Sequence, residues 1–131
     1  MDFDLSEDQL ALRDGARALL DDLAAPPRIR RVAETPERVD RDLWTAMVDQ
    51  GWLGIAVPEA EGGVGLGPVE LGVLLEEVGR HVAPAPFLPT VLALDVHQHV
   101  GAPVLHRLER PDGTAELHAL LRVLHRHLEG A

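Results

Sequence analysis

The chain has 131 residues, of which 46% are apolar and only 3% aromatic, and its formal net charge is −10. This length predicts a single domain that can bury a core. The chain has no cysteine and its 12 basic residues are all arginine, which excludes disulfides, zinc–thiolate sites, cysteine nucleophiles, Schiff bases and a phosphate-loop lysine. The acidic charge argues against a nucleic-acid or anionic-membrane partner.

Nothing in the chain resembles a targeting or membrane-spanning segment. The N-terminal residues 1–4 are acidic and lack the apolar stretch of a signal peptide. No window approaches the roughly 18 consecutive apolar residues of a membrane span. We therefore expect a cytoplasmic protein.

The first predicted helix begins after Ser6, which forms a capping-box pattern with Gln9. Apolar residues then recur at helical spacing on one face, at Leu12, Ala16, Leu19, Leu20 and Leu23. Pro26-Pro27 is predicted to end this helix. Residues 26–37 are interpreted as a connector with solvated arginines, namely Arg28, Arg30 and Arg31.

Two further helices are predicted on either side of a glycine-rich loop. Asp40 is the expected N-cap of one, with Gly51 as its stop, and its apolar residues are Leu43, Trp44, Met47 and Val48. The other begins at Pro68, where a missing N–H costs nothing, and its expected buried residues are Leu71, Leu74, Leu75 and Val78. Glu76 and Glu77 on that helix are interpreted as ordinary exposed carboxylates.

A proline-rich bend over residues 84–89 leads to a predicted helix from about Thr90 to Val100, which Gly101 would end. A last amphipathic segment over residues 112–128 carries Leu117, Leu120, Leu121, Leu124 and Leu128. The low aromatic content favours helix packing over a strand sandwich. The predicted fold is all-α, a small up-and-down helical bundle of about five helices.

Several residues that could belong to a chemical site are better explained by structural roles. Residues 63–67 read G-x-G-x-G without a preceding long strand, which favours a flexible turn over a dinucleotide loop. Glu59 and Glu61 are interpreted as turn and solvated residues. The only serine, Ser6, is explained by capping, so a serine nucleophile is not expected.

The histidines invite a metal hypothesis, because six of the seven follow residue 96. His97 and His99 are two residues apart and face different directions on a helix. His118 and His125 share a face, but Arg122 between them would oppose a cation. No ligand spacing typical of zinc is present, so the sequence predicts no metal site.

The segment from Trp44 to Gly65 carries the most specific pattern in the chain. Its motif residues are Trp44, Gly51, Trp52, Gly54, Pro58, Glu59, Gly62, Gly63 and Gly65. Their combined spacing closely resembles the N-terminal helical domain of the acyl-CoA dehydrogenase family. The resemblance covers about 110 residues and breaks after Pro111. We expect a family-like domain over 1–111 and a departing C-terminal amphipathic helix over 112–131.

The resemblance implies a role in FAD-dependent oxidation of acyl-CoA thioesters between the α and β carbons. In this family the catalytic glutamate usually lies in the C-terminal helical domain, and most flavin contacts come from the middle β-domain and the C-terminal domain. The N-terminal domain lines part of the acyl-chain tunnel. By position this lining would fall near Phe87, Leu88, Val91 and Leu92, although these apolar residues would serve equally well as core. No catalytic residue is expected here, and cofactor-binding residues are unknown.

Three functional hypotheses remain open. The chain is the N-terminal domain of an acyl-CoA dehydrogenase-like flavoprotein, without turnover alone and without FAD bound by itself. Alternatively, it is a non-catalytic helical module that binds a partner chain carrying the β and C-terminal domains, or an inactive truncated remnant. Outward-facing leucines in residues 112–128 would favour the partner-binding hypothesis.

Overall fold

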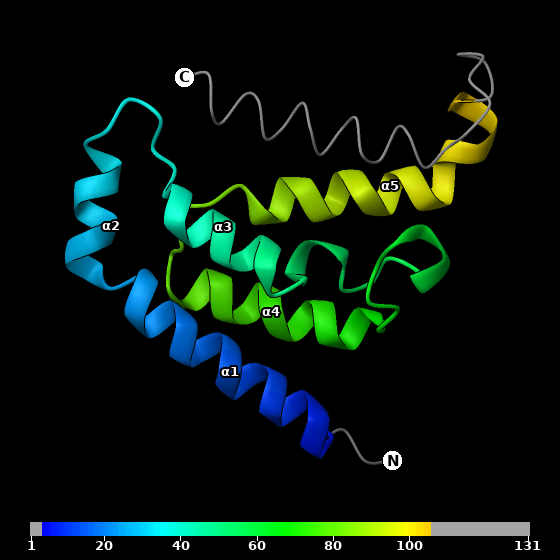
Figure 1. Ribbon diagram of the computed structural model, residues 1–131, viewed down its shortest axis with the longest axis horizontal. Coiled ribbons are helices and arrows are strands. Elements are labelled where there is room, and N and C mark those ends of the chain that lie inside the picture. Colours follow the sequence, from blue (N-terminus) through cyan, green and yellow to red (C-terminus); the bar gives the residue numbers. More distant parts are fainter. Residues whose placement is uncertain (1–3, 106–131) are drawn as a thin grey trace. The chain divides into compact units, whose positions relative to one another are not determined.

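The computed structural model describes residues 4–105, and for residues 96, 97 and 99–105 it describes the backbone alone. The chain divides into two compact units, residues 1–91 and 92–131. The described part contains five α-helices and two 3-10 helices and no strand, which confirms the all-α prediction (Figure 1). The predicted helix over 112–128 lies outside the described residues.

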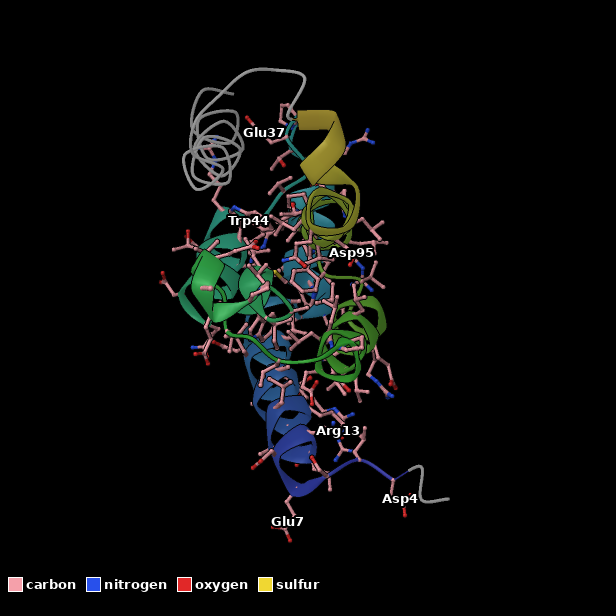
Figure 2. All side chains as sticks on the ribbon, turned by 90° about the vertical axis from the view of Figure 1, so that its right-hand side faces the viewer. Asp4, Glu7, Arg13, Glu37, Trp44 and Asp95 are labelled. Atoms are coloured by element: carbon pink, nitrogen blue, oxygen red, sulfur yellow. The ribbon has the colours of Figure 1, made fainter. Side chains whose placement is uncertain are left out.

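Helix α1 (Glu7–Leu23) begins as its sequence predicts. Ser6 Oγ accepts a hydrogen bond from the Gln9 N–H at 3.2 Å, and the Gln9 side chain accepts one from the Ser6 N–H at 3.0 Å. This is the reciprocal capping box, which satisfies donors that the helix itself cannot. Glu7 points away from the bundle into solvent (Figure 2). On the opposite face Ala16 and Leu20 are buried.

Helix α2 (Pro26–Ala33) corrects the prediction of a connector over 26–37. The two prolines do end α1, but they also occupy the first turn of the next helix. Proline is compatible with that position because the first N–H groups of a helix have no intrahelical partner. Only residues 34–40 connect α2 to the next helix.

Helix α3 (Arg41–Asp49) is capped by Asp40, whose carboxylate accepts a hydrogen bond from the Leu43 N–H at 3.1 Å. The buried residues of α3 are Leu43, Trp44 and Met47. Val48, which was predicted on the apolar face, is 47% exposed. Gly51 follows in the left-handed conformation (φ 73°), where glycine is favoured. Two 3-10 helices, η1 (Trp52–Gly54) and η2 (Glu59–Glu61), then lead into the glycine-rich loop.

Helix α4 (Pro68–Arg80) runs parallel to α1. Three polar contacts join residues 9 and 70, 17 and 77, and 21 and 81. The partners are always 60 or 61 residues apart in sequence, so the two helices run in the same direction. Figure 1 shows α1 alongside α4. The predicted apolar stripe is shifted, because the buried residues are Val73, Leu74 and Glu77, whereas Leu71, Leu75 and Val78 are half-buried.

Helix α5 (Phe87–Leu105) is longer at both ends than the predicted helix over 90–100. It includes Pro89, which lies in the first turn and needs no intrahelical donor. It also continues through Gly101, so this glycine does not end the helix. A glycine costs only about 1 kcal/mol inside a helix, which neighbouring residues can offset.

The core of the first unit is formed by residues from every long helix except α2. Its fully buried large side chains include Leu20, Leu43, Met47, Leu74 and Phe87. The rings of Trp52 and Phe87 meet edge to face, with centroids 6.3 Å apart and planes at 74°. Such pairs are favourable because the edge of one ring is positive and the face of the other negative. Among the described residues, no helix is long and apolar enough to cross a membrane.

Candidate functional site

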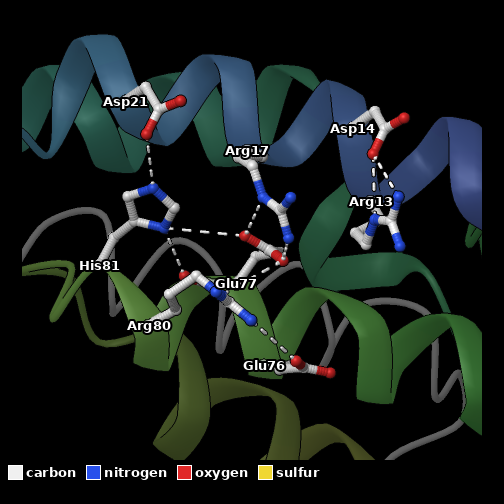
Figure 3. A network of polar contacts seen from close by, with 8 residues as sticks. All are labelled: Arg13, Asp14, Arg17, Asp21, Glu76, Glu77, Arg80 and His81. Atoms are coloured by element: carbon white, nitrogen blue, oxygen red, sulfur yellow. Dashed lines mark hydrogen bonds and ion pairs between the residues drawn. The ribbon is translucent and has the colours of Figure 1, made fainter.

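The buried carboxylate of Glu77 is the centre of a polar network between α1 and α4 (Figure 3). The Arg17 guanidinium donates to both of its oxygens, at 2.6 Å from Nη2 and 3.2 Å from Nε. Arg80 Nε lies 3.7 Å away and His81 Nδ1 3.9 Å away. This burial corrects the interpretation of Glu77 as an exposed carboxylate, whereas Glu76 is exposed as expected.

The surrounding charges keep Glu77 ionised. Hydrogen bonds from Arg17 lower the pKa of Glu77 and outweigh burial, which acts in the opposite direction. A carboxylate that is both paired and of low pKa is a poor general base near neutral pH. Glu77 therefore joins two helices and is not a candidate catalytic residue.

His81 extends this network to the end of α1. Its Nε2 lies 2.9 Å from the Asp21 carboxylate, and its Nδ1 lies 2.8 Å from the Glu77 carbonyl oxygen. Burial lowers the pKa of His81, but the Asp21 carboxylate and the Glu77 carbonyl oxygen raise it more, so the net shift is upward. The folded protein therefore holds the proton of the His81 imidazolium more strongly than the unfolded chain does.

A second ion-pair cluster fixes α2 against the start of α3. Arg28 donates to both carboxylate oxygens of Asp40, and its Nη2 also donates to Asp42 at 3.0 Å. The hydrogen bond from Arg28 is the largest cause that lowers the pKa of Asp40. Arg28 is therefore a structural residue, which corrects its interpretation as solvated, while Arg30 and Arg31 are exposed as predicted.

The glycine-rich loop cannot serve as a phosphate cradle, because its amide groups are used within the chain. Every N–H from Glu61 to Gly67 donates to an acceptor between Gly54 and Glu70, at 2.8–3.1 Å. A Cβ atom on Gly63 would lie 2.1 Å from the Val57 carbonyl oxygen. The predicted turn with close chain approach is confirmed, and no donor of this run is left for a ligand.

The four residues proposed from the family position divide between two faces of α5. Phe87 and Val91 are buried, at 0% and 5% exposure, and Phe87 contacts Trp52 within this chain. Leu88 and Leu92 are 50% and 54% exposed and lie four residues apart, on one side of the helix. Only these two are accessible for contact with another molecule.

The structure also contains an apolar hollow of about 480 Å³ that sequence reasoning missed. It lies between α2, the end of α4 and the α4–α5 connection. Its lining residues are Ile29, Ala33, Arg38, Val78, Gly79, Val82, Ala83, Pro84, Ala85, Leu88 and Pro89. We call this feature the Val82 hollow. These residues come from four separate stretches of sequence, so no local pattern marks them.

The polar side chains of the described residues are largely paired with one another. Of the six arginines in residues 13–38, Arg13, Arg17 and Arg28 already pair with carboxylates. Within residues 4–105, no buried side-chain polar atom lacks a partner and no cluster of three His, Asp or Glu side chains is arranged to hold a metal ion. His118 and His125 lie outside the described residues.

Comparison with known proteins places this helical domain in a family. The family model described as acyl-CoA dehydrogenase, N-terminal domain, matches residues 6–116, and the chain belongs to this family. Acyl-CoA dehydrogenase FadE27 of Mycobacterium tuberculosis is 32% identical over 108 residues, which are 82% of this chain and 29% of FadE27.

Two solved structures are also similar. A variant of the Tcur3481-Tcur3483 steroid ACAD is 46% identical with a TM-score of 0.64, over 71% of this chain and 26% of that chain. The ChsE4-ChsE5 complex of Mycobacterium tuberculosis is 32% identical with a TM-score of 0.68, over 75% of this chain and 27% of that chain. The present chain thus spans less than a third of the length of these relatives.

Proposed function

We propose that this chain acts as the N-terminal helical domain of an FAD-dependent acyl-CoA dehydrogenase and has no turnover by itself. The family match over residues 6–116 carries this proposal. The described residues support the lack of turnover, since the buried acid Glu77 is paired and the glycine loop has no spare donor. FAD would accept the β-hydride of the acyl-CoA, and its binding groups would come from other domains.

The contribution of this domain to the substrate site is a wall for the acyl chain. We narrow the four candidate residues to Leu88 and Leu92, because Phe87 and Val91 are buried. Exposed leucines at positions i and i+4 give one side of a helix an apolar surface. An acyl chain that covers them would gain roughly 25 cal/mol for each Å² of apolar surface removed from water.

The proposed substrate is an acyl-CoA with a steroid-derived acyl group. This proposal rests on the 46% identity to a protein described as a steroid ACAD. The proposed partner is a second chain that supplies the β and C-terminal domains. Both similar structures are described by pairs of proteins, Tcur3481-Tcur3483 and ChsE4-ChsE5, which supports such a pairing.

Flavin retention and dye reduction test this proposal. The purified 131-residue chain should release no FAD on denaturation and should not reduce an artificial electron acceptor with any acyl-CoA. Co-expression with an acyl-CoA dehydrogenase chain from the same genome should give a complex that retains FAD and oxidises a steroid-derived acyl-CoA faster than a straight-chain one. FAD tightly bound to the chain alone would overturn the proposal.

The same experiment separates the alternatives. A complex that forms without FAD-dependent activity would favour the non-catalytic partner-binding module. A stable chain that forms no complex would favour the inactive remnant. Substituting Leu92 by Gln should raise KM for the acyl-CoA in the active complex, while the exposed Val69, changed to Gln, serves as the control.

A further inference from the structure

We propose that His81 is a pH-sensitive switch in this domain: its imidazolium links the end of α1 to the end of α4, and its deprotonation releases the last turn of α1. The two helices run parallel and lie side by side, so their C-terminal ends meet (Figure 1). His81 lies between these ends and contacts Asp21 of α1 and Glu77 of α4 (Figure 3). The switch belongs to the helical domain itself and requires neither FAD nor a partner chain.

Both nitrogens of the His81 ring face oxygen atoms that act as hydrogen-bond acceptors. Nε2 lies 2.9 Å from Oδ1 of Asp21, and Nδ1 lies 2.8 Å from the Glu77 carbonyl oxygen. A neutral imidazole has one N–H, whereas the imidazolium has two. Only the protonated ring can therefore donate to both partners at once. In either neutral tautomer, one nitrogen lone pair would face an oxygen atom.

The end of α1 needs a cation that the helix itself does not provide. Its last turn contains Asp21 and Asp22 and no basic residue. Negative charges are unfavourable at the C-terminal end of a helix, where the helix dipole is negative, and the neighbouring end of α4 is negative for the same reason. The His81 imidazolium contacts both helix ends, so it offsets this repulsion.

The other charged groups around the ring do not titrate near neutral pH in place of His81. From α1, Asp21 faces the ring and Arg17 pairs with Glu77. From α4, the Glu77 carboxylate lies 3.9 Å from Nδ1 of His81, and Arg80 Nε lies 3.7 Å from that carboxylate. The two arginines stay charged, and Arg17 lowers the pKa of Glu77. Histidine is the side chain whose ordinary pKa lies in the neutral range.

Deprotonation of His81 should release α1 and leave α4 in place. His81 is the C-cap of α4, and Val82 follows it in the left-handed conformation, with φ 49°. The Ala83 N–H donates to the Val78 carbonyl oxygen at 3.1 Å, which completes a Schellman motif and fixes the backbone there. The Asp21 side chain is 68% exposed, so water can replace the ring at little cost. A neutral ring turns to relieve its lone pair, and this turn removes Nε2 from Asp21.

The released segment is short because other contacts hold α1 and α2. Gln9 and Arg17 keep their hydrogen bonds to α4, at 2.8 and 2.6 Å, and Arg28 keeps α2 against the start of α3. Opening of the last turn would expose Leu20 and Ala24, which are 0% and 2% exposed in the closed form. Local opening of this kind, without global unfolding, is what amide hydrogen exchange detects.

Hydrogen exchange of the isotopically labelled 131-residue chain, measured against pH, tests the proposal. We compare protection factors, which are corrected for the intrinsic pH dependence of exchange. As pH rises through the pKa of His81, protection of amides 21–24 should fall about two- to fivefold, the range expected for an exposed ion pair, while amides 11–14 stay constant. Ring nitrogen shifts should show two N–H groups below that pKa. The fold-change in opening should equal the ratio of the proton affinities of His81 in the closed and open forms.

Two isosteric variants of exposed residues separate the switch from a general charge effect. Asp21→Asn removes the carboxylate and offers an amide donor to a neutral Nε2. It should lower the pKa of His81 and abolish the pH dependence of protection. Asp22→Asn removes the same charge about 100° further round the helix, so it should keep at least about half of the pH dependence.

Three results would contradict the switch. The first is protection of amides 21–24 that does not change with pH in the wild-type chain. The second is the same pH dependence in Asp21→Asn and in the wild type. The third is an equal loss of protection at amides 11–14, which would show that the proton stabilises the whole domain and does not control the end of α1.

Discussion

Replacement of Phe87 by alanine tests whether this residue is core or substrate-site lining. The ring has 0% exposure and meets the ring of Trp52, itself 4% exposed, at a centroid distance of 6.3 Å. Truncation of a buried phenylalanine costs about 3–5 kcal/mol, because apolar burial is lost and a cavity remains. The edge-to-face pair accounts for about 0.5–1.5 kcal/mol of this loss.

The assay is urea and thermal unfolding of the full chain at pH 7, followed by far-ultraviolet circular dichroism. A loss of about 3–5 kcal/mol is a large part of the 5–15 kcal/mol that stabilises a typical domain. For a chain of this length it corresponds to a fall in Tm of roughly 10–20 °C. The matched control is Leu88→Ala, next to it in sequence but 50% exposed, which should cost less than about 1 kcal/mol.

Equal costs for the two variants would refute this reasoning. The ring of Phe87 would then not belong to the core, and it would return to the set of residues available to the acyl chain. A double-mutant cycle with Trp52→Leu gives a second check, because the coupling energy of the two rings should be about 0.5–1.5 kcal/mol. A coupling near zero would contradict the edge-to-face contact.

Three further predictions concern stability. The pKa of His81 is higher in the folded than in the unfolded protein, so its contribution to stability is fully present below pH 6.5 and is lost as pH rises through the folded pKa. The difference in unfolding free energy between wild type and His81→Gln should therefore shrink over that pH range. A constant difference would contradict the pairing of His81 with Asp21. Gly63→Ala should cost about 1–3 kcal/mol through overlap with the Val57 carbonyl, whereas Gly72→Ala, with nothing within 4 Å of the added Cβ, should be neutral or stabilising. Asp40→Ala removes the cap of α3 and leaves Arg28 only its contact with the exposed Asp42, so a loss of about 2 kcal/mol is expected in urea unfolding. Asp40→Asn should lose less because it keeps the cap.

The starts of three helices could be predicted because their signals are local. Each start is marked by residues close together in sequence, namely Ser6 with Gln9, Asp40, and Pro68. A cap or an N-terminal proline satisfies or removes a donor that every helix leaves unpaired, so its effect does not depend on the rest of the fold. The turn that follows Gly51 could also be predicted, because it uses positive φ angles, which favour glycine.

Two of the corrections, at Arg28 and Glu77, concern contacts between residues that are distant in sequence. Residues 26–37 have a polar composition and resemble a connector, but Arg28 pairs with Asp40, and this contact fixes α2 as a helix. Glu77 has the sequence context of an exposed residue on α4, but α1 covers it and Arg17 neutralises it from 60 residues away. The left-handed conformation of Val82 also has no sequence signal, because valine rarely adopts it.

The sequence by itself determined the all-helical class, most helix starts, and the acyl-CoA dehydrogenase N-terminal family, because periodicity, caps and motif spacing are properties of short segments. Tertiary structure alone decided that α1 and α4 are parallel, that Phe87 is buried while Leu88 is exposed, and that four stretches enclose the Val82 hollow. The physical reason is that burial and ion pairing depend on which elements pack together. An amphipathic pattern shows that a face is buried, but it does not name the partner that covers it.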